Sequence, residues 1–358
     1  MAFVTLNTNK LRANYQFLDK IFKARNIEWS VVTKMLCGNK EYLKELLKLD
    51  IKQVSDSRIV NLKVIKTLAP DIETIFIKPP ARKSIPNVVK YADISMNTEI
   101  STIKLLSHEA KKQGKIHKII IMLEMGELRE GVLHENFVNF YEKVFSLDNI
   151  QVIGIGTNLN CMYGVLPSHD KLIQLSIYKQ LIEAKFDKKI KYISGGSSVT
   201  IPLIFRNLLP KGINHFRVGE TLYLGTDVYN DSIIEGMEVD LFMFYAQIIE
   251  LKNKPSQPIG ELGTNLEGNT YEFSEGAENT TSCRAILDVG LLDVDQQHLT
   301  ATDNDINIVG VTSDVTVADL GENKKGYRTG DFIEFRMDYT GALKILNSRY
   351  VEKVIKNN

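Results

Sequence analysis

A lysine that closes an apolar segment is the first residue whose type and position suggest chemistry. Lys34 follows Ser30–Thr33, and strand alternation would direct its side chain into the open end of a barrel. A lysine in a partly desolvated pocket loses proton affinity and becomes an amine able to form a Schiff base. The alternative interpretation is a lysine that extends to solvent at a strand end.

Two later segments carry groups suited to binding an anion. Ser194–Ser198 combines glycines with serines and precedes a short helix predicted from Val199, while Phe216–Thr221 contains an arginine and a glycine. Glycines allow close backbone approach, hydroxyls donate hydrogen bonds, and a helix N-terminus favours an anion. A Gly/Ser loop alone is often only a turn. Together with Lys34, however, the two segments predict a phosphorylated aldehyde cofactor, for which pyridoxal phosphate fits best.

The elements that must hold these residues alternate between β-branched runs and helical patterns. Eight such units in about 200 residues predict a (β/α)8 TIM barrel, in which the loops after strands seven and eight form the usual phosphate site. The predicted strands are Trp29–Met35, Lys52–Ser55, Glu73–Lys78, Asp93–Met96, Lys118–Glu124, Gln151–Gly156, Lys189–Ile193 and His215–Val218.

A second, mostly-β domain is predicted after the barrel. The expected domains are residues 1–228 and 229–358, and pairing of residues 1–8 with the second domain is left open. No long helical pattern interrupts the second domain, and the polar segment 253–281 is expected to form an extended excursion. The predicted strands are Leu241–Leu251, Ser282–Val289, Ile306–Thr312, Thr316–Leu320, Asp331–Met337 and Ile345–Val354.

Composition restricts the partners. The 358 residues include 44 basic and 44 acidic side chains, so the net charge of zero gives no bias toward nucleic acid or an anionic membrane. The balance conceals a division, because residues 1–228 carry +11 and residues 229–358 carry −11. Three widely spaced cysteines favour a reducing, cytoplasmic location, and no Cys/His cluster suggests a metal site. No apolar run is long enough to span a membrane.

Nearly the whole chain resembles the alanine racemase family, whose members are pyridoxal-phosphate enzymes built from a barrel and a β-domain. The resemblance rests on segments in the family's order and spacing. They are FVTLN at 3–7, VTK at 32–34, NHFRVGETLYLG at 214–225 and IVGVTSDVTVADL at 308–320. Other segments are more similar to one branch, the ornithine and other diamino-acid racemases. These are TKMLCGNKE at 33–41, SDSRIVNL at 55–62, EMGELREGV at 124–132, GIGTNLNCMYGVLP at 154–167 and SGGSS at 194–198.

The resemblance implies a role for each matching position. Lys34 would bind the cofactor as a Schiff base and act as one proton-transfer base. Arg217 would hydrogen-bond the pyridine nitrogen and keep it unprotonated, and Asn158 would lie against the ring. The phosphate and substrate residues it implies form a longer set. They are Ser197, Ser198, Gly219 and Glu220 for the phosphate, Ser194 as a further cofactor contact, and Arg129, Ser313 and Asp314 for the cofactor hydroxyl side and the substrate.

One departure concerns the second catalytic base. The family uses a tyrosine in a Gly-Tyr-x-Asp-Gly pattern, where this chain has Leu291 in the stretch 290–294. Leucine cannot transfer a proton, yet racemisation needs a donor on the face opposite Lys34. Asp293 is the first candidate, ahead of Cys283 and Tyr339, with a turn-capping aspartate as the alternative.

These observations predict a homodimeric, cytoplasmic isomerase that interconverts the L- and D-forms of ornithine or a similar diamino acid. The partner's β-domain is expected to complete the active site. The acidic second domain agrees with a dicationic substrate. The alternatives are racemisation of alanine, lysine or serine, aldol cleavage or dehydration of a D-hydroxy-amino acid, and a pyridoxal-phosphate carrier without activity.

Overall fold

The computed structural model describes residues 2–264, 268, 270 and 280–357, and the chain forms two compact units. The barrel unit comprises Asn9–Val239. The β unit comprises Met1–Thr8 together with Asp240–Asn358.

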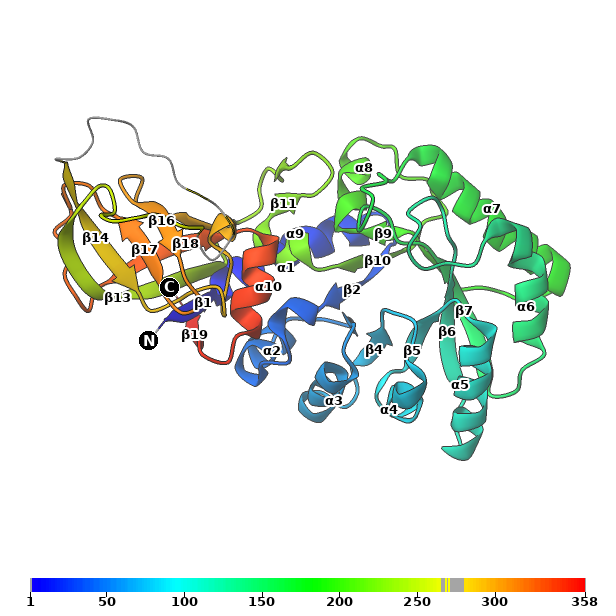
Figure 1. Cartoon of the computed structure of the whole chain (residues 1–358). Helices are drawn as coiled ribbons and strands as arrows, with labels where there is room; N and C mark the ends of the chain where they lie inside the picture. The colour runs from blue at the N-terminus through cyan, green and yellow to red at the C-terminus, as the bar shows by residue number, and fades with distance from the viewer. Residues whose placement is uncertain (1, 265–267, 269, 271–279, 358) are drawn as a thin grey trace. The chain divides into compact units, whose positions relative to one another are not determined.

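The barrel unit is built on one ring of parallel strands (Figure 1). Their order is β8-β7-β6-β5-β4-β3-β2-β10-β9. The first and last strands of this order, β8 and β9, are adjacent in sequence and separated only by Gly195, so the two edges of the sheet come together. This arrangement confirms the predicted TIM-like barrel. The strands are β2 Glu28–Val32, β3 Gln53–Asp56, β4 Glu73–Phe76, β5 Ile94–Asn97, β6 His117–Met122, β7 Ile150–Gly156, β8 Tyr192–Ser194, β9 Gly196–Ser197 and β10 His215–Val218.

Helices cover the outside of these strands (Figure 1). In α1, buried residues recur at helical spacing, and Phe22 packs against both Trp29 of β2 and Phe216 of β10. The helices of this unit are α1 Thr8–Lys23, α2 Lys40–Leu47, α3 Ile59–Leu68, α4 Ile85–Tyr91, α5 Ile100–Lys112, α6 Phe137–Phe145, α7 His169–Phe186, α8 Ile201–Phe205 and α9 Glu220–Leu224. Single turns of 3₁₀ helix are η1 Lys34–Leu36, η2 Arg82–Ser84, η3 His134–Asn136 and η4 Ser198–Thr200, and β11 Thr226–Asp227 pairs with β12 Ser232–Ile233.

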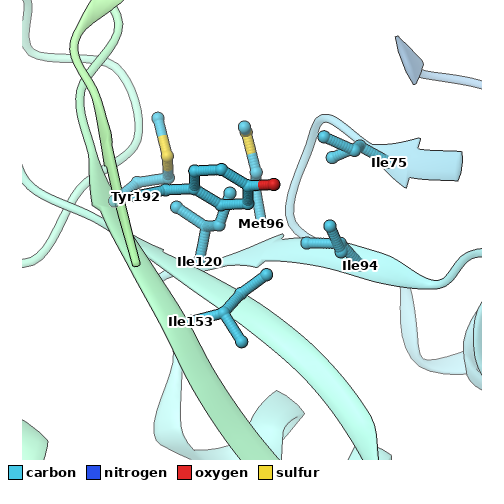
Figure 2. Close-up of a cluster of buried hydrophobic side chains, with 7 residues drawn as sticks. Ile75, Ile94, Met96, Ile120, Ile153 and Tyr192 are labelled. Carbon is cyan, nitrogen blue, oxygen red and sulfur yellow. The ribbon is translucent and has the colours of Figure 1, made fainter. Parts of the chain in front are cut away.

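The interior of the barrel is packed with apolar side chains that the strands turn toward one another. Figure 2 shows this cluster, in which Tyr192 of β8 lies among the isoleucines and methionines of β4 to β7. Burial of one such side chain stabilises the fold by about 1.5–3 kcal/mol. The members are Ile75, Ile94, Met96, Ile120, Met122, Ile153 and Tyr192.

The β unit is a largely antiparallel sheet of order β15-β18-β13-β14-β17-β16 (Figure 1). The first strand of the chain, β1, pairs antiparallel with β13 and parallel with β19. The elements are β1 Phe3–Asn7, β13 Phe242–Pro255, β14 Thr281–Leu287, η5 Gln296–His298, β15 Leu299–Ala301, β16 Asn307–Val311, β17 Thr316–Asp319, β18 Phe332–Met337, α10 Tyr339–Asn347 and β19 Glu352–Lys356.

Two predictions for this unit need correction. The predicted strand 345–354 is instead the end of helix α10 followed by β19, because Asp338 caps the helix through the Gly341 N–H at 2.8 Å and apolar residues then recur at helical spacing. The predicted excursion begins later than expected, because β13 stays paired with β14 as far as Pro255. Residues 265–267, 269 and 271–279 of that segment lie outside the described residues.

Candidate active site

Lys34 lies at the C-terminal end of the barrel strands, directly after β2. Trp29 packs against two aromatic side chains of α1, so its face of β2 is the one that meets the helices. Ser30 faces the opposite way, with its hydroxyl 2.5 Å from that of Ser55 on β3. Lys34 begins η1 and its side chain is exposed. This exposure agrees with the alternative interpretation, a lysine that extends to solvent at the end of a strand.

Asp56, at the end of β3, fixes the segment that precedes Lys34. Its buried carboxylate accepts hydrogen bonds from Thr33 Oγ1 at 2.8 Å, from the Arg58 backbone at 2.7 Å and from Asn61 Nδ2 at 3.2 Å. Burial raises the pKa of this carboxyl, and the hydrogen bonds oppose part of the rise. The backbone from which Lys34 projects is thereby fixed to the neighbouring strand.

Two serines of the predicted anion site have hydroxyl oxygens that already accept a hydrogen bond from the backbone. Ser197 accepts the Thr200 N–H in a capping box before η4, and Ser198 Oγ accepts the Thr221 N–H at 3.3 Å. Since each oxygen acts as an acceptor in these contacts, each hydroxyl hydrogen can be donated to an anion.

The second half of this site follows β10. β9 pairs with β10 so that Ser197 lies opposite Arg217, and Gly219 then leads into α9, which begins at Glu220. A Cβ on Gly219 would lie 3.1 Å from that of Val32, so this close approach to β2 favours glycine. The structure therefore brings the two predicted anion-binding segments and the strand leading to Lys34 together.

The structure places the Ser194 side chain elsewhere. Ser194 is fully buried, its hydroxyl is 2.7 Å from His215 Nδ1, and His215 Nε2 is 2.8 Å from Gln53 Oε1. Burial lowers the pKa of His215 to about 3, so the imidazole is neutral at physiological pH. The Ser194 hydroxyl therefore belongs to this internal polar chain rather than to the group of side chains at the barrel mouth.

Arg217 lies inside the barrel with 5% of its surface exposed. One terminal nitrogen donates to the Thr157 carbonyl at 2.7 Å and to Asn158 Oδ1 at 2.9 Å, and the other lies 3.3 Å from Met96 Sδ. Burial lowers the pKa of the guanidinium to about 10, which leaves it protonated at neutral pH. Arg217 and Asn158, predicted from separate segments, are thus direct neighbours.

Glu130 links the two arginines of the site, and sequence reasoning missed it. Its carboxylate accepts from Asn158 Nδ2 and forms an ion pair with Arg129, and its charge opposes the lowering of the Arg217 pKa by burial. Arginine offers only donors and a carboxylate only acceptors, so the Asn158 amide is oriented from both sides. Glu130 and Asn158 are 28 residues apart, so no local pattern could identify the contact.

The cavities of the barrel unit differ in their relation to this site. A cavity of about 280 Å³ is lined by the first residues of β2, β3 and β4, so it lies at the end of the barrel opposite Lys34. A hollow of about 340 Å³ adjoins the loop after β6 and is lined by Glu124, His134 and Lys171 among others. Neither cavity is lined by Lys34 or Arg217. The candidate active site is therefore identified by its side chains and their contacts, and not by a cavity.

The predicted substrate residues of the β unit lie in two turns that meet. Backbone hydrogen bonds of 3.0 and 2.9 Å join residues 290–293 to residues 312–315. The second turn carries Ser313 and Asp314, which are exposed, and the Ser313 hydroxyl donates to the Asp314 carboxylate at 3.1 Å. Asp293 is half-buried and accepts a hydrogen bond from the C-cap serine of α10. The structure therefore gathers these three residues in one region of the β unit.

Two features are absent from the described part of the chain. None of its helices is both long and apolar enough to cross a membrane. Nor do any three or more of its His, Cys, Asp and Glu side chains form a group that could hold a metal ion.

Comparisons with known proteins agree with this geometry. The family model described as alanine racemase, N-terminal domain, matches residues 6–227. Ornithine racemase of Acetoanaerobium sticklandii is 38% identical over 353 residues, covering 98% of each chain. Lysine racemase of Thermotoga maritima is 30% identical over 352 residues, covering 98% of this chain and 97% of the relative. The structure of alanine racemase from Bartonella henselae with covalently bound pyridoxal phosphate matches with a TM-score of 0.75 at 17% identity, covering 99% of each chain.

Proposed function

The chain belongs to the alanine racemase family, and from this premise we propose that it is a pyridoxal-phosphate-dependent isomerase that racemises ornithine or a similar diamino acid. The observation that carries the proposal is the 38% identity to an ornithine racemase over almost the entire chain. The placement of a lysine, a buried arginine and an anion-binding loop at one end of the barrel supports it. The lysine racemase relative supports lysine as the second candidate substrate.

The residues at the barrel mouth fit this cofactor. The donors for a phosphate are the Ser197 and Ser198 hydroxyls and the backbone amides of Gly219 and Glu220, which begin a helix and so lack intrahelical acceptors. Arg217 supplies a donor for the pyridine nitrogen. When bound, the cofactor supplies an aldehyde that joins an amine and a ring that withdraws electrons, which makes the α-proton of an amino acid acidic.

We assign the proton transfer on one face to Lys34. Its Nζ projects from η1 at the end of β2, and the Asp56–Thr33 hydrogen bond holds the backbone behind it. The amine removes or returns the proton at the substrate Cα. Arg217 remains a cation and can only donate, so a ring nitrogen that faces it would act as the acceptor and stay unprotonated. That arrangement limits electron withdrawal into the ring and favours racemisation over transamination.

The opposite face of the substrate requires a second proton donor. We propose that the turns 290–293 and 312–315 of the β unit of a second copy supply it, with Asp293 as the acid and Ser313 and Asp314 on the substrate. A homodimer of this kind agrees with large apolar side chains exposed on the loops after β6 and β7. They are Leu128, Leu133, Met162, Tyr163 and Leu166, with exposed fractions from 39% to 68%. We also propose a cytoplasmic location, since none of Cys37, Cys161 and Cys283 is in a disulfide bond.

An amino-acid panel in deuterated water tests the proposed reaction. The holoenzyme is incubated with ornithine, lysine, alanine and serine, and loss of the α-proton signal is followed by NMR. We expect the highest rate with ornithine and a measurable rate with lysine. Fastest exchange with alanine or serine would contradict the diamino-acid assignment, and no exchange with any of the four would contradict the racemase.

A further inference from the structure

Glu127 is a buried carboxylate that none of the roles above uses. It lies in the loop 123–131 after β6, and only 1% of its surface is exposed. A buried carboxylate is costly unless it is paired or hydrogen-bonded. Here its partners are five backbone N–H groups of the loop after β7. Oε1 accepts from Cys161, Met162 and Tyr163, and Oε2 accepts from Asn160 and Val165.

The loop 160–165 forms a closed nest around this carboxylate. The Asn160 N–H is also 3.0 Å from the Val165 carbonyl, which brings the two ends of the loop together. Consecutive backbone N–H groups that converge in this way form a concavity for an anion. Burial raises the pKa of the Glu127 carboxyl, but the hydrogen bonds outweigh it and hold the pKa at about 2. The anion of this nest is therefore a permanent part of the fold at neutral pH.

Side-chain packing contributes little to holding the same loop. Met162 is 58% exposed and Tyr163 is 64% exposed, so their apolar surfaces stabilise the folded loop only weakly. Cys161 and Gly164 are exposed as well. Within one copy of the chain, the hydrogen bonds to Glu127 are thus the main contacts that fix this segment.

The loops on both sides of this contact carry residues of the site. The Asn158 amide, which lies between Arg217 and Glu130, comes two residues before the nest. Glu130 comes three residues after Glu127 in a loop that Glu124 also fixes, since its carboxylate accepts N–H groups of residues 126, 128 and 129. Glu127 therefore joins the loop of Asn158 to the loop of its carboxylate partner.

We propose that Glu127 is a positioning residue that fixes the loop 160–165 against the loop 123–131 and thereby holds the Asn158 amide between Arg217 and Glu130. The anchoring of the loop is a property of the fold, whereas its catalytic consequence rests on the proposed function. A neutral amide cannot replace the carboxylate, because one of its two atoms would be a donor facing backbone donors.

The first measurement is amide hydrogen exchange of the holoenzyme. In the wild type we expect the amides of residues 160–163 and 165 to be protected despite their exposed side chains. In Glu127→Gln they should exchange at least about tenfold faster. Glu142→Gln makes the same chemical change on the exposed side of α6 and should leave this exchange unchanged. Equal protection of residues 160–165 in Glu127→Gln and the wild type would overturn the anchoring.

The second measurement separates positioning from general stability by a double-mutant cycle with Asn158→Ala. Glu127→Gln should lower the kcat of α-proton exchange by about 10- to 100-fold with less than about a threefold change in KM. In the Asn158→Ala background the same change should cost less than about twofold, because the residue it positions is already absent. An equal loss in both backgrounds would overturn the proposal.

Two further experiments apply if a variant does not fold or if the wild type is inactive. If Glu127→Gln does not accumulate as folded protein, Glu127→Asp, which keeps the charge on a shorter side chain, enters the same cycle. If the wild type exchanges no α-proton, the proposed function fails. The cycle is then measured by titrating pyridoxal phosphate, where Glu127→Gln should weaken binding only when Asn158 is present. Equal binding by all variants would contradict the positioning role.

Discussion

Arg217 is the residue through which the parts of the site are connected. It is a buried cation held by the Thr157 carbonyl and by Asn158, and the charge of Glu130 supports its protonated form. A buried charge left without partners is strongly destabilising, so these contacts are needed for stability as well as for chemistry. The contacts also determine the direction of the Arg217 guanidinium.

Arg217→Lys tests this use of the guanidinium. Lysine keeps the charge but cannot reach two acceptors in a fixed plane, so the contacts with Thr157 and Asn158 cannot both persist. We expect ornithine exchange to fall by about 10- to 100-fold, measured as kcat by NMR. Arg349→Lys, on an exposed side chain, is the matched control and should leave kcat unchanged. Wild-type kcat in Arg217→Lys would show that the planar contacts do not matter.

Two buried histidines make the stability of the fold depend on pH. Burial lowers the pKa of His117 to about 4 and that of His215 to about 3, from 6.5. Between pH 6.5 and 4.5 the unfolded chain therefore binds protons that the folded chain does not, and the free energy of unfolding falls as the pH is lowered. Each histidine contributes a slope that reaches at most about 1.4 kcal/mol per pH unit within this window. Denaturant titrations across this window should show a smaller slope for His117→Gln, and an identical slope would contradict the assignment.

At the scale of elements, the closure of the barrel depends on a short segment between β8 and β9. Gly195 separates the strand that pairs with β7 from the strand that pairs with β10. A Cβ on Gly196 would lie 2.2 Å from the Phe216 ring, closer than any real contact. The absence of a side chain at Gly196 therefore allows close packing at this seam.

Gly196→Ala should weaken this seam. The added methyl group must displace Phe216, and overpacking of this kind costs about 1–3 kcal/mol of unfolding free energy. Urea denaturation followed by circular dichroism measures the loss. Gly310→Ala, where a Cβ meets no atom within 4 Å, is the matched control. A stability change in Gly196→Ala no larger than that in Gly310→Ala would contradict the close approach.

The strands of the barrel could be predicted from sequence because each is a short apolar run that ends in polar residues. Helix α10 was missed because the β-branched content of 345–354 outweighed the Asp338 cap and the helical spacing that follows it. Glu127 and Glu130 could not be predicted, since their partners lie about 30 residues away and are brought close only by the loops after β6 and β7. The predicted strand 29–35 extends too far, because β2 ends at Val32 and η1 redirects the chain from Lys34.

At the scale of the whole molecule, opposite net charges separate the regions that carry different chemistry. Residues 1–228 carry +11 and contain the groups suited to an anionic cofactor, whereas residues 229–358 carry −11 and contain the turns assigned to substrate. A dicationic amino acid is attracted to the acidic region, and this attraction weakens with salt.

The central claim is that Lys34 performs amino-acid racemisation with pyridoxal phosphate. The most direct measurement is α-proton exchange of L-ornithine in deuterated water by the wild type and by Lys34→Ala, each supplied with the cofactor. We predict exchange and formation of D-ornithine by the wild type, and loss of both in Lys34→Ala. Lys344→Ala, on an exposed side chain of α10, should behave as the wild type. Full exchange and racemisation by folded Lys34→Ala would contradict the account.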